Sequence, residues 1–145
     1  IDIDKKDKTF VDLGSGRGRI TLAVKKLYPE LKKSIGIELS EARFHASQDL
    51  LKHSGAKIKN NVEFFNKNFF DLMFDYKEFD IIFTNNICFA KDNNNEIAEK
   101  IMSNCKKGTY IFSTTDFSNM EKYLIEKISI ISSWSMNSTI SKYRL

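Results

Sequence analysis

The sequence predicts a doubly wound α/β fold, in which a mainly parallel sheet carries helices on both faces and ends in an antiparallel hairpin. Three observations support this prediction. Short apolar runs typical of buried strands alternate with segments of helical spacing through residues 9–113. Three alternating glycines separate the first strand from the first helix. Two β-like runs at the C-terminus, residues 128–134 and 139–145, are joined through residues 136–138 and indicate the hairpin.

The first half of the chain is expected to hold three strands, at residues 9–13, 33–38 and 62–66. Each is a short apolar run bounded by polar residues or turn formers. Between the first two strands, residues 17–28 have helical spacing, and Pro29 directly after them stops the helix. The expected buried face of this helix consists of Ile20, Ala23, Val24 and Leu27.

A second helix is expected between the second and third strands. Ser40 is a suitable N-cap residue for it, and Gly55 is a suitable C-terminal stop. The apolar side chains that this helix carries are Leu39, Ala42, Ala46, Leu50 and Leu51.

The second half of the chain continues the alternation of strands and helices. Strands are expected at residues 79–84 and 109–113, and helices at residues 93–105 and 118–127. The apolar face of the longer helix consists of Ile97, Ala98, Ile101, Met102 and Cys105. The shorter helix is expected to turn inward Met120, Tyr123 and Leu124. No repeat or linker is visible, so residues 1–145 are expected to form a single domain.

The composition is that of a globular protein with a basic balance. A formal net charge of +4 and a pI near 9.0 are compatible with weak contact with nucleic acid, but the evenly spread lysines favour compositional bias over a dedicated binding patch. Cys88 and Cys105 form no CxxC pair, so both are expected to be core residues in a reducing compartment. His45 and His53 lack partners at ligand spacing, so no metal site is expected. Without an apolar run of ~20 residues, the protein is expected to be intracellular, nuclear or cytoplasmic.

The glycine-rich loop predicts a nucleoside cofactor. Gly14, Gly16 and Gly18 permit close backbone approach, and the helix that follows turns its N-terminus toward an anionic group. Glu38 ends the next strand, where doubly wound folds place the acid that binds ribose hydroxyls. A dinucleotide is disfavoured, because Arg19 stands where the dinucleotide motif needs a third small residue. The alternative is a purely structural turn.

Two later strand ends carry further candidate residues, because ligands bind at the carboxyl ends of such strands. Asn68 has the hydrogen-bonding groups for an adenine edge and Phe69 can lie against its ring, whereas Phe70 is interpreted as a core residue. The segment from Asn85 to Phe89 places two amides beside apolar groups, which makes it the expected chemical site. An ordinary asparagine turn is the alternative there.

Residues 12–18, Asp-Leu-Gly-Ser-Gly-Arg-Gly, resemble motif I of class I S-adenosylmethionine-dependent methyltransferases. With the segment Asn-Asn-Ile-Cys-Phe at residues 85–89 and the Trp134–Tyr143 region, nearly the whole chain resembles the catalytic core of the Dot-one (disruptor of telomeric silencing) histone-lysine methyltransferases. The resemblance implies a Rossmann-like class I fold with a seven-stranded sheet and S-adenosylmethionine as cofactor. The cofactor-binding residues that it implies are Phe10, Asp12, Leu13, Gly14, Ser15, Gly16, Gly18, Glu38, Leu39, Asn68, Phe69 and Asn85. The implied catalytic residues are Asn85 and Phe89.

Three departures from the family pattern stand out. Asn68 replaces the usual aspartate, and Lys142 aligns with a channel aromatic, although Tyr143 is adjacent. The helical segment that precedes the sheet in the family is expected to be absent here, so that the chain is either the core of a larger protein or a minimal relative with a borrowed lid.

The resemblance also implies the acceptor and the partners. A lysine acceptor must be neutral, and Ile87, Phe89 and Tyr143 are the candidates for apolar channel walls that favour the neutral amine. The expected partner of a monomeric enzyme is a protein substrate, a nucleosomal histone in particular, with weak DNA contact through the basic surface. Three alternatives remain open: a non-histone protein-lysine methyltransferase, a nucleic-acid amino methyltransferase, whose usual prolines are missing, and an inactive cofactor-binding module.

Overall fold

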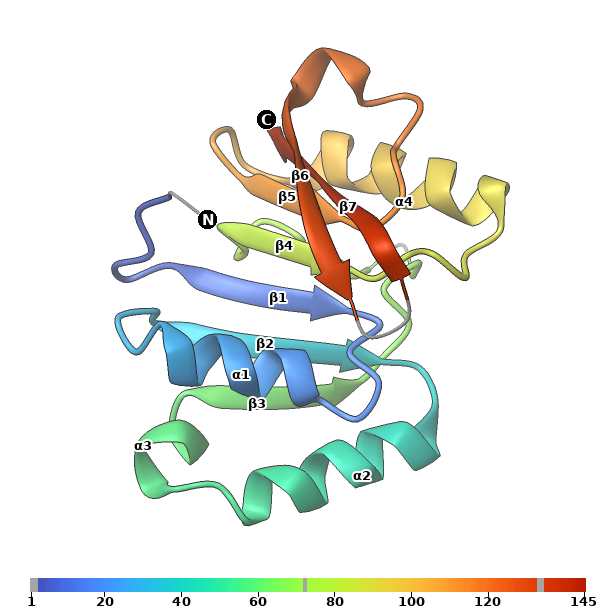
Figure 1. The fold of residues 1–145 in the computed structure, drawn as a ribbon. Helices are drawn as coiled ribbons and strands as arrows, with labels where there is room; N and C mark the ends of the chain where they lie inside the picture. The colour runs from blue at the N-terminus through green and yellow to red at the C-terminus, as the bar shows by residue number, and fades with distance from the viewer. Residues whose placement is uncertain (1–2, 72, 133–134) are drawn as a thin grey trace. The chain divides into compact units, whose positions relative to one another are not determined.

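A computed structural model describes residues 3–71, 73–132 and 135–145 (Figure 1). The chain divides into two compact units, Ile1–Phe74 and Asp75–Leu145. Each unit has its own strands, helices and buried side chains.

The first unit contains three parallel strands in the order β3-β2-β1. Strands β1 (Thr9–Leu13), β2 (Lys33–Glu38) and β3 (Val62–Asn66) coincide with the predicted ranges. The register places Asp12 beside Gly36 and Glu38 beside Asn66, so the polar strand ends are neighbours. Every residue of β1 is buried, because this strand is covered on both faces.

The predicted buried face of the first helix is wrong. Helix α1 (Arg19–Leu27) buries Thr21 and Lys25, whereas Ile20 and Leu27 are 40% and 69% exposed. Ala23 is also exposed, and Val24 is half-buried. The reason is a rotation of the helix. The Lys25 ammonium group donates to the carbonyl oxygens of Pro29 and Leu31, so the Lys25 side of the helix is buried.

The second helix also packs through a small polar residue. Helix α2 (Glu41–Lys52) follows Ser40 as predicted, but its buried residue is Ser47. Leu39 precedes the helix and is 65% exposed, and Leu50 is 40% exposed. Of the other apolar side chains expected on this helix, Ala42 is exposed, and Ala46 and Leu51 are half-buried. A short helix that the sequence did not indicate, α3 (Ala56–Lys59), follows Gly55, so that glycine precedes a helix rather than ending α2.

The second unit contains four strands in the order β4-β5-β7-β6. Strands β4 (Ile81–Thr84) and β5 (Tyr110–Ser113) are parallel and slightly shorter than predicted. Helix α4 (Lys91–Asn104) buries Ile97, Ala98 and Ile101 completely, and Met102 and Cys105 are half-buried, which confirms the predicted face.

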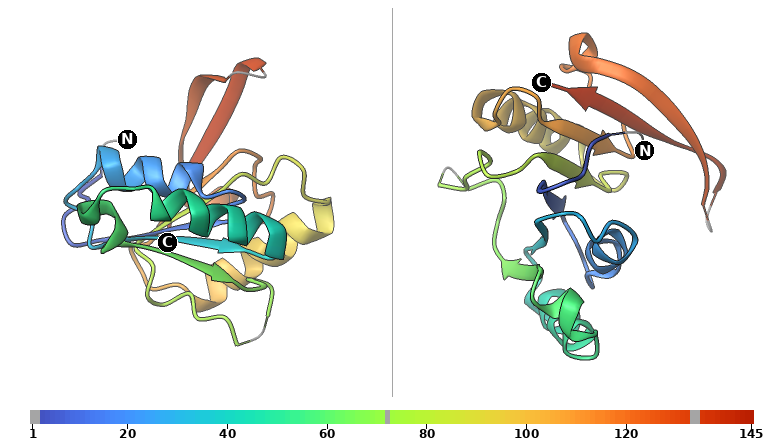
Figure 2. Two further views of the ribbon diagram at one scale, coloured as in Figure 1. Left: turned by 90° about the horizontal axis from the view of Figure 1, so that it is seen from below. Right: turned by 90° about the vertical axis from the view of Figure 1, so that its left-hand side faces the viewer.

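The C-terminal hairpin is confirmed, but its bounds differ from the prediction. Strand β6 (Leu124–Ser132) pairs antiparallel with β7 (Ser135–Arg144), which in turn pairs antiparallel with β5. Residues 136–138 therefore lie within β7 instead of joining the strands. Because β5 pairs only with residues 141–144, the other end of the hairpin extends past β5 (Figure 2).

The predicted helix at residues 118–127 is wrong. Only a 3-10 turn, η1 (Glu121–Tyr123), precedes β6. Met120 is fully buried as expected, but Tyr123 and Leu124 are only half-buried. The spacing of these three apolar residues suits a helix. However, pairing with β7 supplies hydrogen bonds along the whole of β6, and this tertiary interaction overrides the local pattern. Trp134, named in the sequence analysis, lies outside the described residues.

The predicted fold class is confirmed: parallel strands alternate with helices, and an antiparallel pair completes the seven strands of the described residues. The core position predicted for Cys88 is wrong, because its side chain is exposed, and Cys105 is half-buried. None of the helices in the described ranges has the length and apolar content needed to cross a membrane. That the chain forms a single domain stays a prediction.

Candidate functional site

The glycine-rich loop of the first unit folds back onto the end of β2. Gly14 and Ser15 both donate their backbone N–H groups to the Ile37 carbonyl oxygen at 2.9 Å, and Gly18 donates to the Ser15 carbonyl oxygen at 2.9 Å. The φ angles of Gly14, Gly16 and Gly18 are +80°, +56° and +78°, a region that favours glycine. The loop is therefore a tight turn that ends at the N-terminus of α1, where the partial positive charge favours anionic groups.

Gly18 and Gly36 are also needed for packing. A Cβ atom on Gly18 would lie 2.4 Å from the Phe64 ring, and one on Gly36 would lie 2.5 Å from the same ring. The Gly18 Cβ would also approach the Ser47 Cβ to 3.0 Å. The buried Phe64 ring lies against both glycines, so neither position has room for a side chain.

Glu38, the last residue of β2, connects the glycine-rich loop to the turn that follows β2. One carboxylate oxygen accepts the Gly16 N–H at 2.8 Å, and the other accepts the Ser40 N–H at 2.8 Å. The Asn66 amide donates to the Glu38 and Leu39 carbonyl oxygens, both at 2.9 Å, and so holds the turn that follows. This carboxylate is fixed in direction, yet each oxygen has a further lone pair for a ligand hydroxyl.

Asp12 lies under the loop and is 2% exposed. Burial raises its pKa to about 7, and the nearby Glu38 carboxylate adds to this effect, while a hydrogen bond from the Thr21 hydroxyl opposes it. At neutral pH, Asp12 is therefore poised between its charged and neutral forms. Phe10 and Leu13, the other predicted cofactor residues of β1, are buried as well. The Ser15 hydroxyl is buried and has no hydrogen-bond partner among the described residues.

The loop after β3 contains the residues predicted to bind adenine. Asn68 accepts the Phe70 N–H through its side-chain oxygen at 3.0 Å, which stabilises the turn. The Phe69 and Phe70 rings are in contact, with centroids 4.6 Å apart. Phe69 is buried and Phe70 is half-buried, so the ring expected to face a base is the more enclosed of the two. The adenine role of Asn68 and Phe69 stays a prediction.

In the second unit, Asn86 anchors the segment that follows β4. Its side chain is fully buried and pairs with the Thr115 backbone, accepting the N–H at 2.9 Å and donating to the carbonyl oxygen at 3.1 Å. It also donates to the Asn94 side-chain oxygen at 2.6 Å. Asn94 in turn donates to the Phe89 carbonyl oxygen at 3.2 Å. Sequence reasoning missed Asn94 and Thr115, because neither residue has a local pattern that distinguishes it.

The two predicted catalytic residues lie on either side of this anchor. Asn85 is exposed, and its side-chain oxygen accepts a hydrogen bond from the Thr114 hydroxyl at 2.9 Å. Phe89 is half-buried and donates its N–H to the Asn86 carbonyl oxygen at 3.1 Å. Ile87 is 58% exposed. A rigid turn thus presents one amide and one apolar side chain to solvent.

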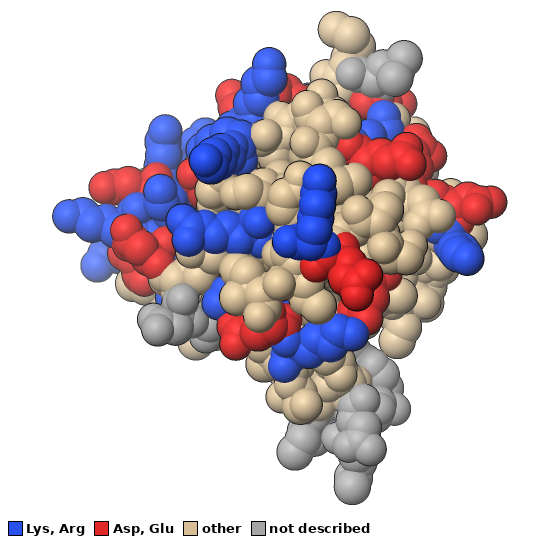
Figure 3. Space-filling model, turned by 90° about the horizontal axis from the view of Figure 1, so that it is seen from above, with Lys and Arg blue, Asp and Glu red and all other residues tan. Residues whose placement is uncertain are grey.

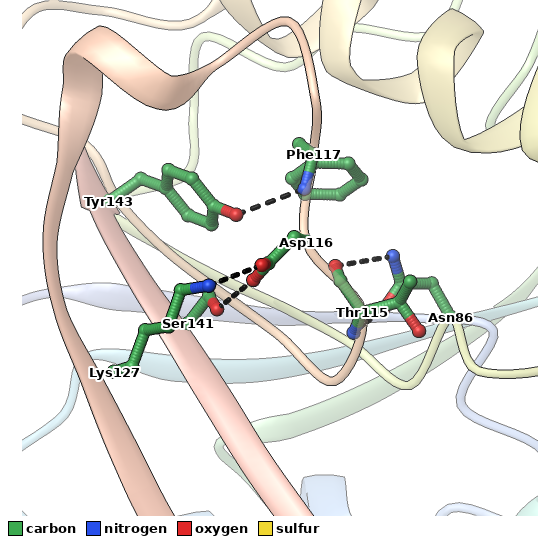
Figure 4. Close-up of polar contacts among 7 residues, drawn as sticks. All are labelled: Asn86, Thr115, Asp116, Phe117, Lys127, Ser141 and Tyr143. Atoms are coloured by element: carbon green, nitrogen blue, oxygen red, sulfur yellow. Dashed lines mark hydrogen bonds and ion pairs between the residues drawn. The ribbon is translucent and has the colours of Figure 1, made fainter.

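The segment after β5 is attached to the hairpin. The Asp116 carboxylate accepts hydrogen bonds from the Lys127 ammonium group on β6 and the Ser141 hydroxyl on β7 (Figure 4). The bond from Lys127 holds the pKa of Asp116 below its usual value. The Phe117 N–H donates to the Tyr143 hydroxyl at 3.0 Å. Tyr143, a predicted channel wall, is only 1% exposed.

Lys142 is buried although it carries a charge. It is 6% exposed and pairs with Glu126 at 2.8 Å, and its ammonium group lies 5.8 Å from the centre of the Tyr110 ring. On the face shown in Figure 3, acidic side chains stand among the basic ones. Within the described ranges, no group of three or more His, Cys, Asp or Glu residues could hold a metal ion.

Solved structures with the same fold include a methyltransferase and a protein in complex with AdoHcy. The mitomycin 7-O-methyltransferase MmcR is 18% identical, with a TM-score of 0.75 over 98% of this chain and 50% of its own. PKMT2 from Rickettsia typhi, in complex with AdoHcy, is 24% identical, with a TM-score of 0.63 over 77% of this chain and 21% of its own. At these identities, the similarity establishes the fold alone.

Sequence relatives identify the family. A histone-lysine N-methyltransferase of Caenorhabditis elegans, H3 lysine-79 specific, is 32% identical over 124 residues, which is 78% of this chain. The chain spans 13% of the length of that relative. The family model described as histone methylation protein DOT1 matches residues 1–144. The chain therefore belongs to the DOT1 family of histone methylation proteins.

Proposed function

We propose that this chain is the cofactor-binding core of an S-adenosylmethionine-dependent protein-lysine N-methyltransferase that acts on a histone. The observation that carries the proposal is the Glu38 carboxylate, fixed by the Gly16 and Ser40 N–H groups directly beside a tight glycine loop. The family match over residues 1–144 supports the same reaction class.

The residues of the first unit fit the cofactor. The remaining lone pairs of Glu38 suit ribose hydroxyls. The φ-positive backbone at Gly16 is open, because apart from its chain neighbours no described residue lies within 4 Å of an added Cβ, and this suits a ligand that approaches closely. Asn68 and Phe69 are assigned to adenine, and the 65% exposed Leu39 side chain offers apolar contact at the loop edge. When bound, the cofactor supplies a methyl group activated by a sulfonium.

The second unit supplies the residues that we assign to the acceptor. A lysine of ordinary pKa, about 10.4, costs about 4–5 kcal/mol to deprotonate at pH 7. Apolar walls lower that cost by disfavouring the ammonium form. Phe89 and Ile87 are assigned to such walls, and Asn85 is assigned to orientation of the reacting groups. Transfer of a methyl group to a neutral amine then needs alignment and exclusion of water rather than a covalent intermediate.

A nucleosomal histone is the acceptor that we propose, because the curated relative is named as specific for lysine 79 of histone H3. This acceptor implies an intracellular protein that works in the nucleus. The net charge of +4 suits weak contact with nucleosomal DNA. We further propose that the enzyme acts as a monomer.

The test is tritiated methyl transfer from S-adenosylmethionine to nucleosomes, free histones and bare DNA, with cofactor affinity measured separately. We expect label on a core histone of the nucleosome. Asn85→Ala should lower turnover more than cofactor affinity, and equal losses would remove its special role. Label on DNA alone would indicate a nucleic-acid amino methyltransferase. Cofactor binding without label on any acceptor would contradict the enzymatic proposal for this chain.

A further inference from the structure

The residues that follow β4 and β5 are neighbours in the second unit. Thr84 and Ser113 are opposite each other in the parallel register, so Asn85 and Thr114 emerge side by side. The Thr114 N–H donates to the Thr84 carbonyl oxygen at 3.3 Å. The Thr114 hydroxyl oxygen lies 2.9 Å from the Asn85 side-chain oxygen and 3.2 Å from that of Asn86.

A threonine hydroxyl has a single proton, so it donates to one of these two oxygens at a time. The Asn86 oxygen already accepts the Thr115 N–H at 2.9 Å, and the Asn86 amide is held by its own donations as well. The Asn85 oxygen is the nearer acceptor. When the Thr114 hydroxyl donates to the Asn85 oxygen, Asn86 therefore still keeps its other hydrogen bonds.

This bond decides which group Asn85 presents. The terminal torsion of an exposed asparagine is broad, so without a partner its amide would sample both orientations. With its oxygen held by Thr114, Asn85 turns its NH₂ group outward as a hydrogen-bond donor. This outward NH₂ group can donate to an oxygen of the cofactor or substrate, but it cannot accept a hydrogen bond from an amine.

The three residues that follow Thr114 each have a hydrogen-bond partner outside their own segment, which fixes the backbone next to Thr114 (Figure 4). Thr115 is paired with the Asn86 amide, Asp116 with Lys127 and Ser141 on the hairpin, and the Phe117 N–H with the Tyr143 hydroxyl. Four successive residues thus have partners on the turn after β4 and on both hairpin strands. The Thr114 hydroxyl has a rigid support.

We propose that Thr114 is a positioning residue, which orients the Asn85 amide for methyl transfer, and that the contact of Asp116 with the hairpin holds Thr114 in place. The role of the oriented amide rests on the proposed function, whereas the orientation itself is independent of activity. The two are therefore tested by separate readouts.

The first readout is the Asn85 side-chain amide in ¹⁵N-correlated spectra, assigned from the peak that disappears in Asn85→Ala. Thr114→Val keeps the shape and removes the hydroxyl, so we expect the Asn85 NH₂ peaks to shift and to show greater mobility. Thr114→Ser keeps the hydroxyl and should preserve them. Thr115→Val, the same change at the next residue, is the matched control and should also preserve them. Asp116→Ala should move the Asn85 peaks in the direction seen for Thr114→Val.

The second readout is the methyl-transfer rate at saturating cofactor. Thr114→Val should lose about tenfold in kcat, the value of one hydrogen bond, with less than a twofold change in cofactor Kd. Thr114→Ser should have a rate close to that of the wild type.

Unchanged Asn85 peaks in Thr114→Val would overturn the positioning role. A Thr114→Ser variant as impaired as Thr114→Val would also overturn it. If the wild-type chain transfers no methyl group while the peaks shift as expected, the proposed function fails and the orientation stands. If Thr114→Val does not fold, Asp116→Ala tests the positioning role instead: shifted Asn85 peaks support it and unchanged peaks overturn it.

Discussion

Replacement of Gly18 by alanine should destabilise the protein through two separate effects. Gly18 has a φ of +78°, and its added Cβ would lie 2.4 Å from the Phe64 ring. The first effect is backbone strain, because the left-handed region costs a residue with a side chain about 1–2 kcal/mol. The second is overpacking, which in a tight interior costs about 1–3 kcal/mol.

The Phe64 ring has little room to relieve this contact. Gly36 lies against the same ring, where its own added Cβ would be 2.5 Å away, and Phe64 is only 6% exposed. The two effects together predict a loss of about 2–5 kcal/mol in the free energy of unfolding for Gly18→Ala. With a urea m-value of about 2 kcal/mol/M, the midpoint should fall by about 1–2.5 M.

Gly16→Ala is the matched control in the same loop. Gly16 has a φ of +56°, but apart from its chain neighbours no described residue lies within 4 Å of its added Cβ, so only the strain applies. Urea unfolding without cofactor should therefore show Gly18→Ala to be less stable than Gly16→Ala by about 1–3 kcal/mol. Combining Gly18→Ala with Phe64→Leu should recover part of this difference. Equal losses at the two glycines would refute the packing argument.

Three further predictions concern individual side chains. Asp12 has a pKa of about 7 in the folded state, above its unfolded value of 3.8, so its contribution to the free energy of unfolding should fall by about 3 kcal/mol as pH rises from 4 to 7. Urea unfolding across this range should show that fall for wild type relative to Asp12→Asn, and parallel curves would contradict it. Glu38→Gln turns an NH₂ group toward the Gly16 or the Ser40 N–H, so the Kd for S-adenosylhomocysteine should rise about 10- to 100-fold by calorimetry; an unchanged Kd would rule out Glu38 as a ligand. Asn86→Ala leaves buried partners unpaired at a cost of about 2–4 kcal/mol, which should lower Tm by about 6–12 °C. Asn85→Ala, at the exposed neighbour, should change Tm far less, and similar shifts for both would show that burial is not the cause.

The order of strand, glycine loop, helix, strand and acid was predictable from sequence because each step has a local signal. An apolar run bounded by glycine specifies β1, and Glu38 follows the next apolar run directly. The contact between Glu38 and the loop then follows from parallel pairing, which brings the ends of β1 and β2 together. The same logic placed Asn85 at a strand end, although its functional role stays a prediction.

The faces of α1 and α2 were not predictable from apolar spacing. Successive residues of a helix are about 100° apart, so a small rotation exchanges one buried line for its neighbour. In α1 that rotation is set by polar contacts of Thr21 and Lys25, and in α2 the buried position is Ser47, near the Phe64 ring and Gly18. The partners of Thr21 and Lys25 are polar groups of Asp12, Pro29 and Leu31, and a hydrophobic pattern contains no information on such contacts.

The sequence by itself determined the α/β class, the glycine-rich loop and the strand ends at which polar residues gather, because these depend on local propensity and spacing. Only the tertiary structure decided that Asn86 is the buried anchor while Asn85 is exposed, and that Thr114 holds the Asn85 amide. It also decided that the chain from Leu124 onward is a strand. The physical reason is the same in each case. Local sequence does not tell which of two adjacent amides is buried, or whether an apolar triplet with helical spacing forms a helix or a strand. Hydrogen-bond partners on distant segments decide both.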